Sequence, residues 1–215
     1  MAEFTFYTVA MSRGQIARWA LHEAGADYEQ VVFDWISKPD NYTDINPMGK
    51  VPALVHHHAS ADGSSHDHVI TEAAAINHYL AETHPKAGLL PDAHEKAAYF
   101  RWLFFAAGPL EQAVIGKAMG WEVPEDKSGM AGFGSLELAL DTLDGWLKVN
   151  DWAAGNRFTM ADTYVGSQFI WGLRFGSIPE TPAFKAYVER CTTRPKCIEA
   201  VAVDQALIDA AAAEA

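Results

Sequence analysis

The chain has 215 residues, and its 28 acidic and 16 basic side chains give a net charge of −12. This length fits one large domain or two small ones, at roughly 150 residues per domain. The acidic balance excludes a general nucleic-acid binder and a protein that docks on anionic lipid, because both need a basic surface. With 49% hydrophobic and 20% charged residues, the composition is that of a folded globular protein.

The start of the chain and its cysteines indicate the compartment. Residues 1–4 carry no basic region and no long apolar run, so we expect no signal peptide. No apolar run approaches the roughly 20 residues of a membrane helix, so we expect no membrane partner. Cys191 and Cys197 form neither a CxxC motif nor a metal cluster. A soluble protein in a reducing cytoplasm is therefore expected.

Strand-like and helix-like patterns alternate over the first 83 residues. Runs rich in aromatic and β-branched residues predict strands at 4–9, 28–33, 51–55 and 69–70. Apolar residues at helical spacing predict helices at 16–24 and 71–83, the first ended by Gly25. The order indicates a small sheet with helices, an α/β domain over residues 1–83.

The second half of the chain contains no strand-like residue pattern. Helical periodicity predicts helices at 99–110, 135–149, 160–173, 182–193 and 196–213. Residues 84–92 contain two prolines and a glycine and form the expected linker. Because strands mixed with helices are followed by helices alone, we expect a separate all-α domain over residues 93–215.

The most specific motif is the segment 46–54, with the sequence NPMGKVPAL. Pro52 opens a predicted strand, although proline cannot donate to a sheet ladder. A cis Val51–Pro52 bond would turn the backbone of Val51 towards a ligand. An ordinary turn into an edge strand is the simpler alternative, and the spacing alone favours it.

A second motif, TEAAAI at residues 71–76, opens a helix directly after a strand. A helix N-terminus presents free N–H groups and partial positive charge, which suit a carboxylate. Glu72 can accept a hydrogen bond from a ligand ammonium at the same place. The alternative is that Thr71 caps the helix and Glu72 complements its dipole.

The third motif is a serine, Ser12, in the loop between the first strand and the first helix. The general role of a serine at this position is to cap the helix. A hydrolase nucleophile is excluded, because no histidine lies nearby in sequence and the chain has no GxSxG motif.

Together these three motifs, in this order and spacing, resemble the cytosolic glutathione transferases, over nearly the whole chain. The resemblance implies a thioredoxin-like domain that binds glutathione and a helical domain that holds an apolar second substrate. It also implies a buried capping box at Thr159 and Asp162, whose residue types and spacing fit one.

The resemblance also assigns roles to the matching residues. Val51, beside a cis Pro52, would pair its backbone with the cysteinyl part of glutathione. Glu72 and the amide of Ala73 would hold the γ-glutamyl end. The family usually has serine where this chain has Ala73, so one hydroxyl contact is missing, worth roughly 1–3 kcal/mol. The lysines that would meet the glycyl carboxylate are Lys50 and Lys38.

For catalysis, the resemblance makes Ser12 the hydroxyl donor to the glutathione sulfur, with Tyr7 as the alternative. Some branches of the family use an early tyrosine, but they follow it with Arg-Gly-Arg, whereas residues 9–12 here are VAMS. A free thiol is only a few per cent thiolate at pH 7, and donors aimed at the sulfur favour the thiolate. As a strand residue, Tyr7 has the simpler interpretation of packing against a helix.

The implied reaction is the addition of glutathione to a small hydrophobic electrophile by a cytoplasmic homodimer active in detoxification. Glutathione is then a co-substrate, and no permanently bound cofactor is expected. Relatives with this layout also act as peroxidases, isomerases, dehalogenases or ether-cleaving enzymes, or are catalytically silent binding proteins. A thiol–disulfide oxidoreductase would need a cysteine in place of Ser12. The predicted walls of the second-substrate pocket, which by spacing alone are equally core residues, are Trp102, Phe105, Met119, Trp171 and Phe175.

One histidine-rich segment falls outside these motifs. Residues 56–68 hold five of the nine histidines and the turn signal Asp62-Gly63-Ser64. Clustered imidazoles can bind zinc, but the turn signal favours a lengthened exposed hairpin without a functional metal site.

Overall fold

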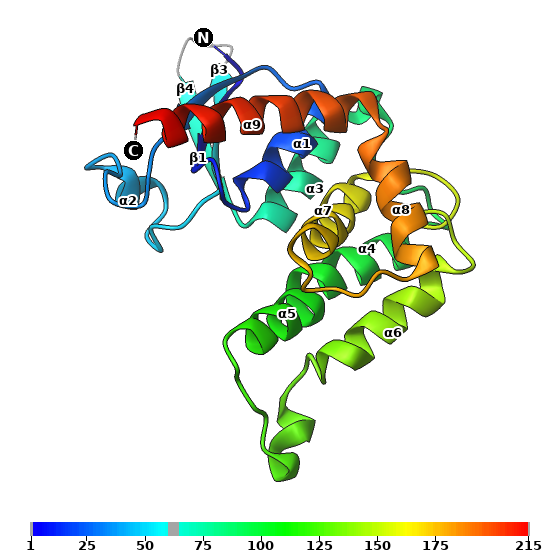
Figure 1. Ribbon diagram of the computed structural model, residues 1–215. Helices are drawn as coiled ribbons and strands as arrows, with labels where there is room; N and C mark the ends of the chain where they lie inside the picture. Colours follow the sequence, from blue (N-terminus) through cyan, green and yellow to red (C-terminus); the bar gives the residue numbers. More distant parts are fainter. Residues whose placement is uncertain (1, 60–64, 215) are drawn as a thin grey trace. The chain divides into compact units, whose positions relative to one another are not determined.

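A computed structural model describes residues 2–59 and 65–214, and its chain forms two compact units (Figure 1). The first unit contains Met1–Leu89 together with Arg194–Ala215, and the second contains Leu90–Thr193. The α/β fold of the first unit and the helical fold of the second confirm the predicted fold class.

A mixed sheet forms the centre of the first unit, in the strand order β2-β1-β3-β4. Strands β1 and β2 are parallel, whereas β3 is antiparallel to both β1 and β4. The strands are β1 (Phe4–Thr8), β2 (Tyr28–Val32), β3 (Ala53–Ala59) and β4 (Ser65–Thr71). Each predicted strand is present, and β3 begins one residue after Pro52, so the proline stays out of the ladder.

Helices α1 (Gly14–Ala24) and α3 (Ala73–Thr83) contact each other, and α3 contacts β3 and β4. The one-turn helix α2 (Tyr42–Ile45) and the 3₁₀ turn η1 (Pro85–Ala87) complete the connections. The core of the unit includes Phe6, Ile16 and Leu80, all 0% exposed. Because Thr71 belongs to β4 and Glu72 precedes α3, the alternative prediction that Thr71 caps this helix was wrong.

The long helix α9 (Pro195–Glu214) packs along α1 (Figure 1). The sequence-based division had placed residues 93–215 together in the helical domain. Residues 194–215 instead belong to the first unit, because α9 finds its packing partner there. Periodicity showed that this segment is a helix but not what it packs against.

The second unit is helical throughout its regular elements. It contains α4 (Lys96–Phe105), the π turn η2 (Ala106–Leu110), α5 (Glu111–Ala118), the 3₁₀ turn η3 (Glu125–Met130), α6 (Leu136–Leu147), α7 (Met160–Phe175) and α8 (Pro182–Thr192). The predicted helix 99–110 thus continues into α5 through the π turn. Pro109 lies inside that turn and lacks an N–H, so regular α-helical pairing cannot continue there.

A buried capping box starts α7, as the resemblance implied. The carboxylate of Asp162, 0% exposed, accepts from the backbone N–H of Thr159 at 2.8 Å and of Ala153 at 2.7 Å. The hydroxyl of Tyr187 donates to the same carboxylate at 2.8 Å. Burial raises the pKa of Asp162 in spite of these hydrogen bonds.

The histidine-rich segment forms a lengthened hairpin, as predicted, and residues 66–68 on its second strand are exposed, but its first histidine is buried. The ladder of β3 and β4 continues to Ala59 and Ser65, so that His56 pairs with His68 in register. His56 is only 7% exposed, and its Nδ1 lies 2.9 Å from the hydroxyl of Tyr79. The predicted turn residues 62–64 lie outside the described residues.

Candidate functional site

The register of the sheet gathers the sequence motifs at one end of the first unit. Ala53, the first residue of β3, pairs with Tyr7 of β1 on one side and with Thr71 of β4 on the other. Because β3 runs opposite to its two neighbours, it begins where they end. The Ser12 loop, Val51–Pro52 and Glu72 therefore all leave the sheet at the same edge.

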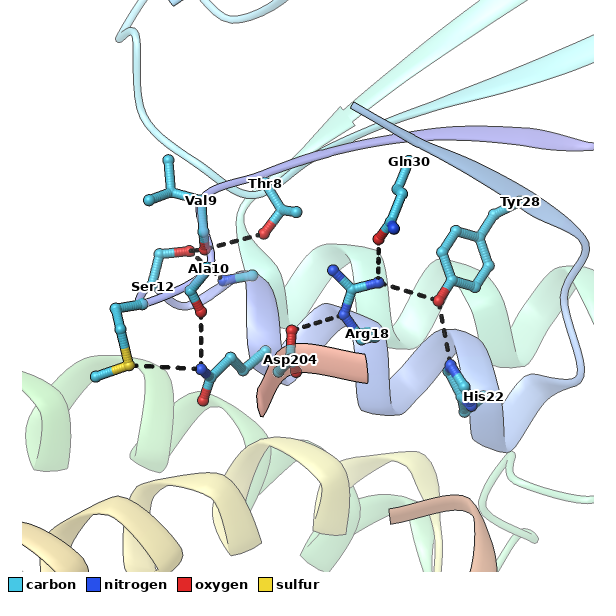
Figure 2. Close-up of polar contacts among 12 residues, drawn as sticks. Thr8, Val9, Ala10, Ser12, Arg18, His22, Tyr28, Gln30 and Asp204 are labelled. Carbon is cyan, nitrogen blue, oxygen red and sulfur yellow. Dashed lines mark hydrogen bonds and ion pairs between the residues drawn. The ribbon is translucent and has the colours of Figure 1, made fainter. Parts of the chain in front are cut away.

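Ser12 is held in a tight local network before α1 (Figure 2). Its hydroxyl donates to the carbonyl oxygen of Val9 at 2.6 Å. The hydroxyl oxygen of Ser12 also accepts a hydrogen bond from the backbone N–H of Gly14 at 3.0 Å. The hydroxyl is half-buried and satisfies the N–H of Gly14, the first residue of α1, although the N-cap position itself is Arg13, one residue later than expected.

Gly14, which the sequence analysis did not single out, lets the chain pass close to β1. A Cβ built at this position would lie 1.8 Å from Oγ1 of Thr8, a distance that no side chain tolerates. The sequence feature that could have identified it is a glycine two residues after the serine, at the start of α1. Gly14 thereby fixes how closely the Ser12 loop lies to the end of the strand.

Tyr7 lies on β1 in an apolar cluster with Val9, Tyr42, Val51 and Ala53. Its ring centroid is 5.6 Å from that of Tyr42. Burial raises the pKa of Tyr7, and the charge of Asp67 raises it further, so the phenol keeps its proton at neutral pH. Tyr7 thus packs near Val51 and against Tyr42 of α2, which fits the simpler interpretation of a strand residue that packs against a helix.

A hydrogen-bonded turn carries residues 46–50 into the cis Val51–Pro52 bond, which the sequence allowed as one of two possibilities. The carbonyl oxygen of Lys50 accepts from the side-chain amide of Asn46 at 2.7 Å and from the hydroxyl of Tyr42 at 2.5 Å. Gly49 has a φ of 62°, which favours glycine. Asn46 and Tyr42 are supporting residues that the sequence analysis missed, although an Asn-Pro pair signals a turn.

Helix α3 begins directly after a residue with an unusual backbone conformation. Glu72 has a φ of 65°, the one positive value among the described non-glycine residues. Such a conformation costs about 1–3 kcal/mol and persists where the surroundings impose it. No described side chain caps this helix. The side chain of Glu72 is exposed, whereas Ala73 is buried.

The two predicted lysines are both exposed, and the ammonium group of Lys38 contacts the turn that contains Lys50. The Nζ of Lys38 donates to the carbonyl oxygen of Gly49 at 3.1 Å and lies 5.8 Å from the ring centroid of Trp35. Lys38 and Lys50 therefore flank the same turn. These two lysines place positive charge at the edge of the sheet where the sequence motifs meet, in a chain whose net charge is −12.

The predicted pocket residues of the helical unit differ in exposure. Trp102 is 1% exposed and packs on Trp146, so it is a core residue, and its prediction as a pocket wall was wrong. Phe105 and Trp171 are half-buried. Met119 and Phe175 are 66% and 59% exposed. These four residues remain predicted pocket residues.

The helical unit also contains a cavity of about 430 Å³ between the end of α5 and the start of α6. Trp121, Phe133 and Leu138 contribute apolar surface to it, and Lys117 contributes an ammonium group. The predicted pocket residues do not line this cavity.

Comparison with known proteins identifies the family. Residues 10–83 match the family model "Glutathione S-transferase, N-terminal domain", and residues 104–195 match "Glutathione S-transferase, C-terminal domain". The chain belongs to the glutathione S-transferase family. Among curated relatives, glutathione S-transferase 2 of Schizosaccharomyces pombe is 31% identical over 83% of this chain and 78% of its own length. Glutathione S-transferase GstA of Escherichia coli O157:H7 is 28% identical over 86% of this chain and 90% of its own length.

Other relatives extend the comparison. Rat maleylacetoacetate isomerase is 32% identical over 74% of this chain and 72% of its own length. The structure of a glutathione transferase from Methylococcus capsulatus has a TM-score of 0.73 at 28% identity, covering 94% of this chain and 98% of that one. A sphingomonad glutathione S-transferase, solved in complex with glutathione, has a TM-score of 0.70 at 25% identity, with the same two coverages.

The described residues form neither a membrane span nor a cluster of metal ligands. None of their helices combines the length and apolar character needed to cross a bilayer. No group of three or more His, Cys, Asp or Glu side chains among them is arranged to hold a metal ion.

Proposed function

We propose that this protein is a glutathione transferase that activates glutathione as a thiolate and adds it to a small hydrophobic electrophile. The observation that supports this best is the row Tyr7–Ala53–Thr71 across the sheet. It brings the Ser12 loop, the cis-proline turn and the start of α3 to one edge, as a ligand with several polar groups requires. The family membership and the glutathione complex of the sphingomonad relative support the same ligand.

Each part of glutathione has a matching group at this edge. The backbone of Val51 would pair with the cysteinyl residue. The uncapped N–H groups at the start of α3, beginning with Ala73, would bind the γ-glutamyl carboxylate, and Glu72 would bind the ammonium. Lys50 and Lys38 would neutralise the glycyl carboxylate. The local positive groups allow an anionic ligand to bind to an acidic protein.

Ser12 would act by exchanging one hydrogen bond for a stronger one. Its hydroxyl donates to the carbonyl of Val9, and a rotation about the Cβ–Oγ bond would direct the proton to the glutathione sulfur. The N–H of Gly14 can remain bonded to Oγ during this rotation. A hydrogen bond to a charged group contributes about 1.5–3 kcal/mol, more than the neutral bond that it replaces.

The reaction then follows from thiolate chemistry. The thiol proton leaves to solvent, and the sulfur lone pair forms a bond to the electrophilic carbon. The electrons of the broken bond leave with the departing group, or move to the neighbouring atom when the substrate is an activated double bond. Lowering the thiol pKa by two units would require about 2.7 kcal/mol of preference for the thiolate. One charged hydrogen bond and the α1 N-terminus are of that order.

A second function, glutathione-dependent isomerisation, is favoured by the similarity to maleylacetoacetate isomerases. An isomerase uses the same thiolate, but it adds the sulfur to a double bond and then releases it, so glutathione is not consumed. Measuring glutathione consumption together with product formation separates the two reactions.

The test of the proposal combines binding and turnover. Wild-type protein should bind glutathione in calorimetry and conjugate it to a model aryl halide. Ser12→Ala should keep the affinity and lose at least about tenfold in kcat, whereas Ser177→Ala, at an exposed turn of the helical unit, should behave as wild type. Wild-type protein that neither binds nor conjugates glutathione would instead indicate a silent relative.

We also propose that the protein is a homodimer. On α4, Phe100 and Phe104 are 37% and 63% exposed, and their rings stack at 6.3 Å. Large contiguous apolar patches mark interaction surfaces, and we propose that this aromatic pair is part of one. Light scattering should give twice the chain mass, and Phe104→Glu should shift it to the monomer. A wild-type monomer at micromolar concentration would exclude the homodimer.

A further inference from the structure

Helix α1 is joined to α9, and to Arg194 just before it, by two ion pairs and one histidine–carboxylate contact, which we call the α1–α9 seam. Its pairs are Glu23–Arg194, His22–Glu199 and Arg18–Asp204. Burial lowers the pKa of His22. The numbers rise along α9 as they fall along α1, so the helices are antiparallel. The pairs range from the bidentate Glu23–Arg194 contact to the fully enclosed Arg18–Asp204 contact.

Arg18 is the most enclosed member of the seam and reaches three elements (Figure 2). Its side chain is 0% exposed, and Nε donates to Oδ1 of Asp204 on α9 at 2.7 Å. Nη1 donates to Oε1 of Gln30 at 2.7 Å and to the hydroxyl of Tyr28 at 3.1 Å, both on β2. The guanidinium carbon also lies 5.1 Å from the ring centroid of Phe6 on β1.

This arrangement is not the one that gives the greatest stability. Nη2 of Arg18 is buried without a hydrogen-bond partner among the described residues. Burial raises the pKa of Asp204 to about 6, although Arg18 lowers it. A buried ion pair of this kind is often no more stable than apolar side chains of the same size. What the pair does supply is a fixed direction and depth for α1 between the sheet and α9.

The start of α1 transmits that position to Ser12. The side-chain amide of Gln15, in the first turn of α1, donates to the carbonyl of Ala10 at 2.8 Å. The backbone N–H of Gln15 donates to the carbonyl of Ser12 at 3.2 Å, and the N–H of Gly14 donates to its hydroxyl oxygen at 3.0 Å. The loop that carries Ser12 is therefore hydrogen-bonded directly to α1, whereas Val51 precedes β3 and Glu72 precedes α3, which contacts α1 through helix packing.

We propose that Arg18 is a positioning residue for the reaction: its ion pair with Asp204 lets α9 hold α1 at the depth at which the Ser12 hydroxyl meets the glutathione sulfur. This inference rests on the proposed function. The proposal predicts different effects on two parts of the site. Loss of the ion pair should displace the Ser12 hydroxyl and leave Val51 and Glu72, which would bind the peptide part of glutathione, in place.

The test uses Asp204→Asn, which keeps the size of the side chain and removes its charge. We expect kcat for conjugation to fall by about tenfold, because small displacements of a reacting group have effects of this size. The dissociation constant of glutathione should change by less than about twofold. The groups proposed to bind its peptide part lie next to β3 and α3, and they bind the ground state and the transition state alike. Asp209→Asn, an exposed position on the same helix, is the matched control and should match wild type.

A merely structural role would give a different result. The concentration of binding sites and kcat would then fall together in Asp204→Asn, and the inference would be overturned. If Asp204→Asn does not fold, the double variant Arg18→Met with Asp204→Leu replaces the pair with apolar side chains. Wild-type kcat in the folded double variant would also overturn the inference, whereas low kcat with unchanged affinity would support it.

A further readout does not depend on catalysis. Hydrogen exchange at the amides of Gly14, Gln15 and Ile16 reports the bonds that these groups make to Ser12 and Arg13. Exchange should accelerate in Asp204→Asn and stay as wild type in Asp209→Asn. If wild-type protein fails to bind glutathione, the proposed function fails, and this exchange measurement alone decides whether the pair fixes the loop. Unchanged exchange would overturn it.

Discussion

The hydroxyl of Ser12 donates to the carbonyl of Val9 at 2.6 Å, while its oxygen accepts the N–H of Gly14. The same side chain thus satisfies the first N–H of α1, a capping contact from the residue before the N-cap Arg13, and is the proposed donor to sulfur. Different measurements test the two roles. The capping contact contributes to the free energy of unfolding, whereas donation to sulfur contributes to thiolate formation.

The capping role predicts a stability effect in Ser12→Ala. The N–H of Gly14 loses its acceptor, and the free energy of unfolding should fall by about 1 kcal/mol. Ser12→Gly should fall by less, because glycine is a tolerated cap. Urea denaturation of both variants checks this. Equal losses for alanine and glycine would contradict the capping role.

The close approach at Gly14 predicts that alanine is not tolerated there. Its Cβ would meet Oγ1 of Thr8 at 1.8 Å, so Gly14→Ala should destabilise the protein by about 1–3 kcal/mol. Gly145 on α6 is the matched control, because nothing lies within 4 Å of a Cβ built there. Gly145→Ala should instead stabilise by up to about 1 kcal/mol. Similar melting temperatures for the two variants would argue against the steric account.

The alanine after Glu72 predicts a gain of affinity. Ala73→Ser would add a hydroxyl at the start of α3, beside the proposed carboxylate site, and one added hydrogen bond to a charged group is worth about 1.5 kcal/mol. We expect the dissociation constant of glutathione to fall by about tenfold. Ala75→Ser, at an exposed position of the same helix, should leave it unchanged. Calorimetry on both variants decides, and equal affinities would place the carboxylate elsewhere.

Asp204 predicts a definite sign for the pH dependence of stability. Burial raises its pKa from 3.8 to about 6, so the folded protein binds this proton more tightly than the unfolded chain. The resulting stability is fully present below pH 3.8 and is lost as the pH rises through about 6. At about 1.4 kcal/mol per pKa unit, the loss is about 3 kcal/mol.

The measurement is the difference in unfolding free energy between wild type and Asp204→Asn across this pH range. Wild type should lose stability relative to the variant as the pH rises. The titratable and charged groups around the pair, in the rest of the α1–α9 seam, are His22 with Glu199 and Glu23 with Arg194, and burial lowers the pKa of His22. They are present in both proteins, so the difference reports the effect of removing the Asp204 carboxylate. Relative stability that instead rises with pH would show that Arg18 dominates over burial.

Local patterns predicted most of the sheet and its motif edge. The aromatic and β-branched runs located each strand, and Val51–Pro52 and Glu72 lie where the order of elements required. Antiparallel pairing of β3 then brings their ends together as a consequence of topology. The residues that hold this edge from behind, such as Tyr42 and Asn46, were less accessible, because their hydrogen bonds depend on the conformation of the turn.

Contacts between distant segments could not be predicted. Arg18 and Asp204 are 186 positions apart, and each alone has the pattern of a solvated charge on a helix. Trp102 failed for a related reason, since an aromatic residue at helical spacing is compatible with both a core and a pocket wall. His56 was assigned with residues 57–68 to an exposed hairpin, and its burial could not be predicted, because Phe4 and Tyr79, which cover it, are distant in sequence.

The most direct test of the account is the ultraviolet absorbance of the glutathione thiolate, titrated with pH on the saturated protein. Wild type should show an apparent thiol pKa well below the solution value of about 8.5. In Ser12→Ala the pKa should return towards that value at unchanged affinity, whereas Tyr7→Phe should retain the lowered value. A lowered pKa that survives in Ser12→Ala and is lost in Tyr7→Phe would contradict the central claim and assign the donor to Tyr7.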